Sequence, residues 1–178
     1  MTAEDTTVGN YFVANYPPFS FWTADHVPRA LAVLERGPAA DVPLGLYVHI
    51  PFCRKRCDFC YFKVYTQKSS KDIERYLSAV LGELELLAAR PYLRGREPAF
   101  VYFGGGTPSY LSESQLQRLF EGLQQRLPWG AAREVAFECE PGTLSEPKLR
   151  LLGELGVTRL SIGAGTFDPQ IPAPTTRA

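Results

Sequence analysis

Three of the four cysteines in the sequence stand close together, at Cys53, Cys57 and Cys60. Thiolates at this spacing repel one another unless a metal ion or cluster neutralises them, so the segment predicts a metal site. A structural zinc site needs four ligands; His49 is the candidate fourth ligand, although its place within a predicted strand favours a buried, hydrogen-bonded histidine. A [4Fe–4S] cluster fits the short loop better, and three thiolates would leave one iron open to an external ligand.

A glycine-rich segment and two acidic residues are the other candidates for chemistry. Gly104, Gly105 and Gly106, followed by Thr107, allow the backbone to approach a ligand closely; an ordinary tight turn is the alternative. A nucleoside triphosphate loop is disfavoured, because no Gly-Lys-Ser/Thr follows. Glu138 falls at the carboxyl end of a predicted strand, where a buried carboxylate needs a hydrogen-bond donor. The other acidic residue, Glu140, is expected to be a solvated neighbour. Cys139, between the two, faces the opposite side of the strand and is expected to be a small buried apolar residue.

Strand and helix patterns alternate around these residues. Strands are predicted at 45–50, 99–103, 134–139 and 157–162, and helices begin after the capping residues Ser69 and Ser112 and near Ser145. Each strand is short and expected to be mostly buried, which predicts an α/β fold with a parallel sheet. Ligands of such sheets bind at the carboxyl ends of the strands, where the cysteines, the glycines and Glu138 converge.

Residues 1–43 form an arm rich in proline and aromatic residues, with one helical segment from Ala24 to Arg36. We expect an extended arm wrapped on the domain, since so many exposed aromatic side chains would form an adhesive patch. An arm that binds a partner protein is the alternative. Residues 168–178 are rich in proline and threonine and are predicted to be a disordered tail.

The composition excludes several classes of protein. The 178 residues are 45% apolar and 21% charged, which corresponds to about one globular domain. Nineteen basic and nineteen acidic residues cancel, so no overall field attracts nucleic acid or an anionic membrane. No apolar run of about 18 residues is present, and the acidic, polar start 1–5 differs from a secretory signal. We therefore expect a cytoplasmic protein with no membrane span and no nucleic-acid partner.

The cysteine loop, Cys-x3-Cys-x-aromatic-Cys, resembles the cluster loop of the radical S-adenosylmethionine (SAM) superfamily. Four segments in order are similar to the oxygen-independent coproporphyrinogen III dehydrogenase (oxidase) family, which also includes haem carriers, methyltransferases and cyclopropanating enzymes. The similar segments are 47–53, 102–109, 138–141 and 156–163. The resemblance covers 44–167 and implies a partial (β/α) barrel of the radical SAM type.

By this resemblance Cys53, Cys57 and Cys60 hold a [4Fe–4S] cluster whose open iron binds SAM. The resemblance also implies the residues that contact SAM: Tyr47, Phe59 against the adenine, Gly104, Gly105, Gly106, Thr107 and Glu138. For Tyr47 a core aromatic is the alternative. An electron donor such as flavodoxin or ferredoxin would reduce the cluster. The family reaction is cleavage of SAM to a 5′-deoxyadenosyl radical, which starts oxidative decarboxylation of tetrapyrrole propionates.

The sequence also departs from the family pattern. Tyr61 and Phe62 follow the last cysteine of the loop, where coproporphyrinogen enzymes have a further cysteine at the second position. Gly165 stands where the family has a glutamine that contacts SAM. Family members continue with further βα units, so we expect a truncated or split product. A haem carrier, a methyltransferase or cyclopropanating enzyme, and an inactive fragment stay open beside the oxidase. The basic run 54–56 would attract an electron donor or a tetrapyrrole carboxylate, although a solvated surface is the favoured interpretation.

Overall fold

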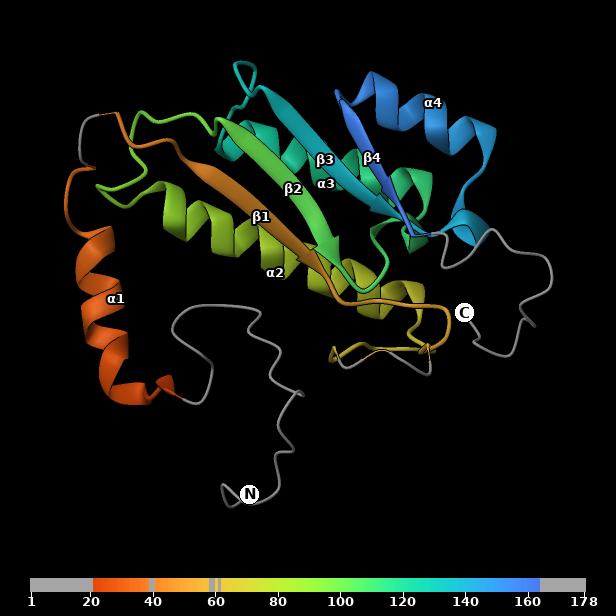
Figure 1. Cartoon of the computed structure of the whole chain (residues 1–178), viewed down its shortest axis with the longest axis horizontal. Coiled ribbons are helices and arrows are strands. Elements are labelled where there is room, and N and C mark those ends of the chain that lie inside the picture. Colours follow the sequence, from red (N-terminus) through yellow and green to blue (C-terminus); the bar gives the residue numbers. More distant parts are fainter. Residues whose placement is uncertain (1–20, 39–40, 58–59, 61, 164–178) are drawn as a thin grey trace, which may run out of the picture.

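The computed structural model describes residues 21–38, 41–57, 60 and 62–163. Its centre is a sheet of four parallel strands in the order β1-β2-β3-β4 (Figure 1). The strands are β1 (Gly45–Ile50), β2 (Phe100–Gly105), β3 (Glu134–Cys139) and β4 (Arg159–Ile162). This confirms the predicted α/β class and the parallel sheet.

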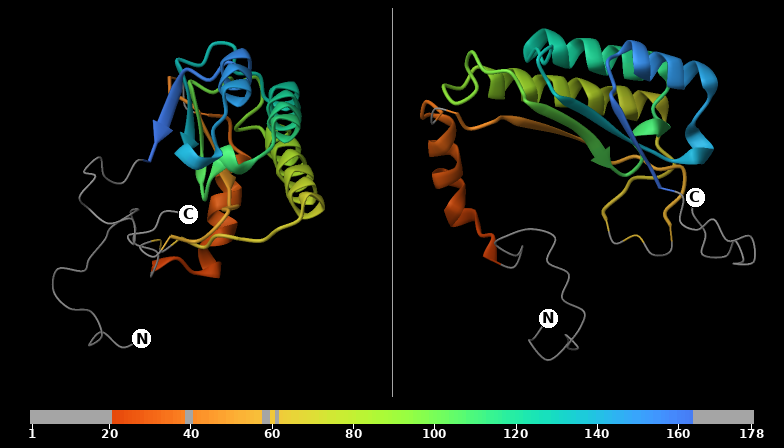
Figure 2. Two further views of the ribbon diagram at one scale, coloured as in Figure 1. Left: turned by 90° about the vertical axis from the view of Figure 1, so that its right-hand side faces the viewer. Right: turned by 45° about the horizontal axis from the view of Figure 1, so that its top comes forward.

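Helices α2 (Ser70–Ala88), α3 (Glu113–Arg126) and α4 (Glu146–Glu154) connect successive strands and lie on one face of the sheet (Figures 1 and 2). Each crossover therefore advances the sheet in the same direction. A doubly wound sheet reverses its strand order and has helices on both faces, whereas a barrel does neither. The arrangement is that of the expected partial barrel.

The two longer helices begin as the sequence predicts. Ser69 and Asp72 form a capping box at the start of α2, and Ser112 and Gln115 form one at the start of α3. In each box the serine side chain accepts from the N3 backbone N–H and the N3 side chain accepts from the N-cap N–H, which satisfies two donors that the helix leaves free.

The core lies between the sheet and these helices. Alternate strand residues point toward the helices, and Phe103 of β2 stacks on Phe120 of α3 with 4.4 Å between ring centroids. Phe137 of β3 and Trp129 complete an aromatic cluster around this pair. Aromatic packing of this kind adds to the free energy of area burial.

The prediction that the strands are mostly buried is wrong for two of them. In β1 buried Val48 and Ile50 alternate with exposed residues, and no residue of β4 is buried. His49, expected to be buried, and Tyr47, for which a core position was the alternative, both lie on the exposed face of β1. The reason is that α2, α3 and α4 cover one face only, so side chains on the other face of the sheet are left exposed (Figure 2).

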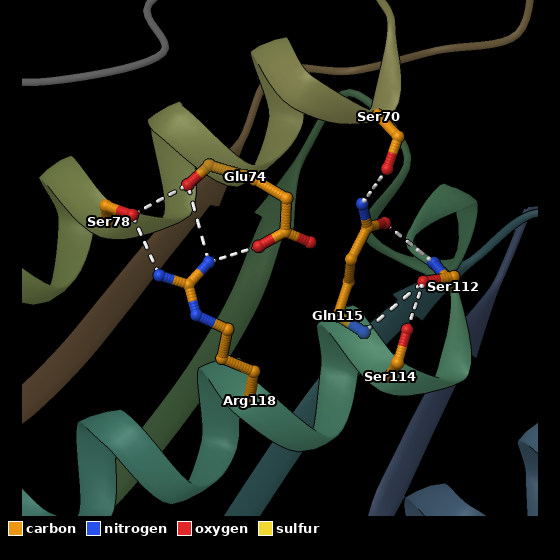
Figure 3. Close-up of polar contacts among 7 residues, drawn as sticks. All are labelled: Ser70, Glu74, Ser78, Ser112, Ser114, Gln115 and Arg118. Atoms are coloured by element: carbon orange, nitrogen blue, oxygen red, sulfur yellow. Dashed lines mark hydrogen bonds and ion pairs between the residues drawn. The ribbon is translucent and has the colours of Figure 1, made fainter.

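A polar seam joins α2 to α3 outside the core (Figure 3). Gln115 is buried; its Oε1 accepts from the Ser112 N–H at 3.0 Å and its Nε2 donates to Ser70 Oγ at 3.4 Å. Arg118 pairs with Glu74 and donates to Ser78 Oγ at 2.8 Å. The two helices are thereby held in register at their amino-terminal halves.

The described part of the arm does not pack as expected. Helix α1 (Val27–Leu34) follows a 3-10 turn, contains no buried residue and lies at the amino-terminal end of the strands (Figure 1). Phe21 and Trp22 before it are 67% and 59% exposed, so this part is not wrapped on the domain. The contacts that join α1 to the segment after α2 include the Glu35–Arg90 ion pair at 2.6 Å.

Several expectations lie outside the described residues: the first 20 residues of the arm, Phe59, Gly165 and the tail 168–178. No helix in the described part of the chain is long and apolar enough to cross a lipid bilayer.

Candidate metal and cofactor site

The cysteine loop leaves the carboxyl end of β1 and folds back against it. The Cys53 N–H donates to the Tyr65 carbonyl at 3.1 Å, and the Tyr65 N–H donates to the Pro51 carbonyl at 2.8 Å. Cys53 is buried, while Cys57 and Cys60 are half-buried. Burial raises the pKa of the Cys53 thiol, a hydrogen bond from Thr107 Oγ1 at 3.4 Å opposes the rise, and the charges of the other two cysteines add to it. A bound metal centre would instead lower the pKa of Cys53, because metals bind the thiolate form.

The glycine loop approaches the cysteine loop so closely that side chains are excluded. A Cβ on Gly106 would lie 2.9 Å from Cys53 Sγ and 2.9 Å from the Phe52 carbonyl oxygen. Gly105 has φ +122°, a conformation that favours glycine, and a Cβ there would lie 2.8 Å from the His49 ring. The backbone of this loop therefore forms one wall beside the cysteines.

Glu138 receives the hydrogen bonds that its position predicts. Tyr102 Oη donates to Glu138 Oε1 at 2.6 Å, and the Gly105 N–H donates to Oε2 at 3.2 Å. The bond to Glu138, with burial, raises the pKa of Tyr102 to about 12. The Tyr47 ring stacks on Tyr102 with centroids 6.0 Å apart, and its hydroxyl lies 3.0 Å from His49 Nδ1. Partial burial, then the charge of Glu138, raises the pKa of Tyr47.

These residues surround a half-open cavity of about 290 Å³ at the carboxyl edge of the sheet. Seven of the ten predicted site residues line it: Cys53, Cys57, Cys60, Gly105, Gly106, Thr107 and Glu138. Gly104 and Tyr47 do not line it. Gly104 packs beside the Glu138 carboxyl group, and Tyr47 reaches Glu138 through its stack on Tyr102.

Cys139 behaves as the small buried residue that its strand position predicts. Its side chain belongs to the hydrophobic core, and its thiol lies 3.8 Å from the Phe137 carbonyl oxygen. Burial raises its pKa to about 11. A thiol that resists ionisation is a poor metal ligand.

Sequence reasoning missed two residues of this region. Tyr102 was not singled out, although parallel pairing of β1 with β2 places it opposite Tyr47. Glu140, interpreted as a solvated neighbour, is half-buried and lines the cavity with the cysteines. Its Oε2 is buried and lacks a hydrogen-bond partner among the described residues. No sequence pattern gave that signal, because it depends on how three loops meet.

The donor set fits an iron–sulfur cluster and a polar ligand. All four cysteines are free thiols. Within the described ranges no three His, Cys, Asp or Glu side chains are close enough to share a single metal ion. In a cubane each cysteine binds a different iron atom, so the sulfurs stand further apart. Gly105 and Gly106 leave space beside the cysteines, and Glu138 and Glu140 line the same cavity with carboxyl groups, which suits a second, non-metal ligand.

Comparison with known proteins agrees with this donor set. The family model of the radical SAM superfamily matches residues 47–178. The chain belongs to the radical SAM superfamily. Membership implies a [4Fe–4S] cluster and SAM as cofactors.

Two similar proteins from Escherichia coli carry different functional names, a chaperone and an oxidase. The chain is 37% identical to the heme chaperone HemW of Escherichia coli over 128 residues, 72% of this chain and 33% of that protein. It is 35% identical to the oxygen-independent coproporphyrinogen III oxidase of Escherichia coli over 158 residues, 88% of this chain and 34% of that protein.

The solved structure of Escherichia coli coproporphyrinogen III oxidase (HemN), described as a radical SAM enzyme, superposes with a TM-score of 0.76 at 31% identity. The match covers 88% of this chain and 36% of that one. The chain thus spans about a third of the length of these relatives.

Proposed function

We propose that this chain forms the cluster- and SAM-binding part of a coproporphyrinogen III oxidase-like protein of porphyrin biosynthesis. The observation that carries the proposal is the shared cavity, in which the three-cysteine loop faces the glycine loop and Glu138. When bound, the cluster and SAM supply a reductively generated 5′-deoxyadenosyl radical for oxidative decarboxylation of propionate side chains.

In this proposal Cys53, Cys57 and Cys60 ligate the cluster. Gly104, Gly105 and Gly106 offer backbone polar groups to SAM without side-chain obstruction, and Thr107 supports the turn through its bond to Cys53. Glu138, fixed by Tyr102 and Gly105, accepts hydrogen bonds from SAM. Tyr47 borders the ligand from the sheet face, and Phe59 lies against the adenine.

The electron donor would approach the same loop. Arg54, Lys55 and Arg56 are exposed, and Lys55 and Arg56 also border the cavity; their charge suits an acidic flavodoxin or ferredoxin. We also propose the cytoplasm as the compartment, since a reducing thiol pool keeps the ligand cysteines available.

Replacement of one ligand tests the site. In anaerobically reconstituted protein, Cys57→Ala should remove the visible absorbance of the cluster and most of about four irons per chain. Cys139→Ala is the matched control, because its thiol points into the core, and should keep both. Unchanged iron in Cys57→Ala would contradict the ligand assignment. Stoichiometric zinc in place of iron would contradict the cluster.

The similarity to heme chaperone HemW favours a second function, haem binding without oxidation. Incubation with reductant, SAM and coproporphyrinogen III under argon separates the two. Formation of protoporphyrinogen supports the oxidase. Tight haem binding without decarboxylation supports the carrier. If the protein shows neither decarboxylation nor haem binding, the chain has neither activity by itself.

A further inference from the structure

One carboxylate in the cavity wall has no role in the function proposed above. Glu140 Oε2 is buried and makes no hydrogen bond within the described part of the chain, yet its residue lines the cavity that holds the three cysteines. A buried, unpartnered carboxylate oxygen costs free energy, and natural proteins rarely tolerate one without a ligand or partner. Glu140 therefore brings to the cavity wall a carboxylate that still lacks one hydrogen-bond partner.

The backbone around Glu140 is fixed on both sides. Its N–H donates to Ser109 Oγ at 2.9 Å, and its carbonyl accepts from the Thr143 N–H at 3.0 Å and from Thr143 Oγ1 at 2.9 Å. Lys148 Nζ donates to the Ser109 carbonyl at 2.8 Å and to the Thr143 carbonyl at 3.0 Å. Lys148 thus links the two residues that hold the Glu140 backbone. The backbone from which the Glu140 side chain projects is therefore held in place by the scaffold, as binding sites require.

The charge of Glu140 is not neutralised by a neighbouring side chain. Among the described residues none of the ion pairs within 4.0 Å includes it. The nearby arginines are engaged with carbonyl groups: Arg54 donates to Gly142 at 3.0 Å, and Arg56 donates to Cys60 through Nε at 3.1 Å and Nη2 at 2.8 Å. Lys55 also borders the cavity, and none of these ion pairs joins it to Glu140.

We infer that Glu140 binds a positively charged group of the ligand that fills this cavity and so determines its specificity for a cationic ligand. The inference rests on the proposed function, in which the ligand is SAM. SAM carries two cationic groups, the methionyl ammonium and the sulfonium, and a fixed carboxylate complements either one.

The test is direct binding of SAM to the reconstituted protein, measured by equilibrium dialysis with labelled SAM. Glu140→Gln keeps the shape and removes the charge, and should weaken binding by about 10- to 100-fold, the effect of losing one charge-assisted hydrogen bond. Glu154→Gln makes the same charge change on the exposed end of α4 and should leave the Kd unchanged. Equal Kd values for wild type and Glu140→Gln would overturn the inference.

S-adenosylhomocysteine, which keeps the ammonium but lacks the sulfonium, identifies the group that is bound. Equal weakening for both ligands assigns Glu140 to the ammonium, and weakening for SAM alone assigns it to the sulfonium; either result supports the inference. If wild-type protein binds no SAM, the proposed function fails together with the inference. If wild type binds SAM and the variant binds equally well, the inference alone fails.

Iron content and melting temperature show whether Glu140→Gln is folded and loaded. If it is not, Glu140→Asp and Glu140→Asn form a second pair, equal in size and different in charge. Tighter SAM binding by Glu140→Asp than by Glu140→Asn supports the inference, and equal binding overturns it.

Discussion

Gly106 sets the distance between the two loops that form the cavity. Gly106→Ala places a methyl group 2.9 Å from Cys53 Sγ and from the Phe52 carbonyl, so the cysteine loop must shift. We expect the variant to lose about 1–3 kcal/mol of unfolding free energy and at least half of its reconstituted iron. Iron analysis and urea denaturation measure the two effects.

Gly153→Ala is the matched control for that substitution. Gly153 lies on the exposed surface of α4 with nothing within 4 Å of the added Cβ. The change should stabilise the helix by about 0.5–1 kcal/mol and leave iron loading intact. Equal iron loss in both variants would show that the close approach at Gly106 does not matter.

The Tyr102–Glu138 hydrogen bond predicts a dependence of stability on alkaline pH. The pKa of Tyr102 is about 12 in the folded protein and about 10 when unfolded. Below pH 10 the Tyr102 phenol is neutral in both the folded and the unfolded protein, so the hydrogen bond contributes fully to the free energy of unfolding. As the pH rises from 10 toward 12 the unfolded state ionises first, and the contribution is lost.

Glu138→Gln should lower the pKa of Tyr102 toward 10, because the carboxylate that holds the phenol proton is gone. Titration of ¹³C-labelled tyrosine followed by NMR measures this shift, with the Tyr102→Phe spectrum identifying the signal. A Tyr102 signal that still titrates near 12 in Glu138→Gln would contradict the assigned hydrogen bond.

At the scale of elements, the polar seam between α2 and α3 depends on Gln115. Gln115→Ala removes one half of the α3 capping box and the bond to Ser70, and leaves the Ser112 N–H without its side-chain acceptor. We expect a loss of about 1–2 kcal/mol in urea denaturation. Arg118→Ala removes an exposed ion pair and should cost less than about 1 kcal/mol. A larger loss of unfolding free energy in Arg118→Ala than in Gln115→Ala would mean that the ion pair, not the contacts of Gln115, joins the helices.

The elements also explain how the cavity residues meet. β1, β2 and β3 end at one edge, so three separate segments deliver the cysteines, the glycines and the acidic pair to one place. Arg54 fastens the cysteine loop to the turn after β3 through the Gly142 carbonyl. The cysteine loop is therefore attached both to β1, which it follows, and to the turn after β3.

For the whole molecule, one aromatic cluster joins the sheet to its helical layer. Phe120 of α3 has no exposed surface and contacts Phe103, Phe137 and Trp129. Phe120→Ala should cost about 3–5 kcal/mol of unfolding free energy, because it removes a large buried ring and leaves a cavity. Circular dichroism during urea denaturation gives the value.

Leu86→Ala serves as the control for that core substitution. Leu86 is 68% exposed on α2, and its loss should change stability by less than about 0.5 kcal/mol. Similar losses of unfolding free energy in both variants would show that the aromatic cluster does not stabilise the fold more than a surface residue does.

The sequence by itself determined the α/β class and the limits of most elements, and it singled out the three cysteines as candidate ligands. These follow from local patterns: apolar periodicity, capping serines, and thiols within one loop. The same patterns placed Glu138 at a strand end and predicted its need for a donor, which the Tyr102 and Gly105 hydrogen bonds confirm.

Only the tertiary structure decided which face of the sheet is covered, and therefore that Tyr47 and His49 are exposed. It also decided that Glu140 lines the cavity with one carboxylate oxygen buried and unpartnered, and that α1 contains no buried residue. Burial depends on what other segments lie opposite a side chain, and those contacts are long-range. A strand or loop pattern records only its own near neighbours in the chain.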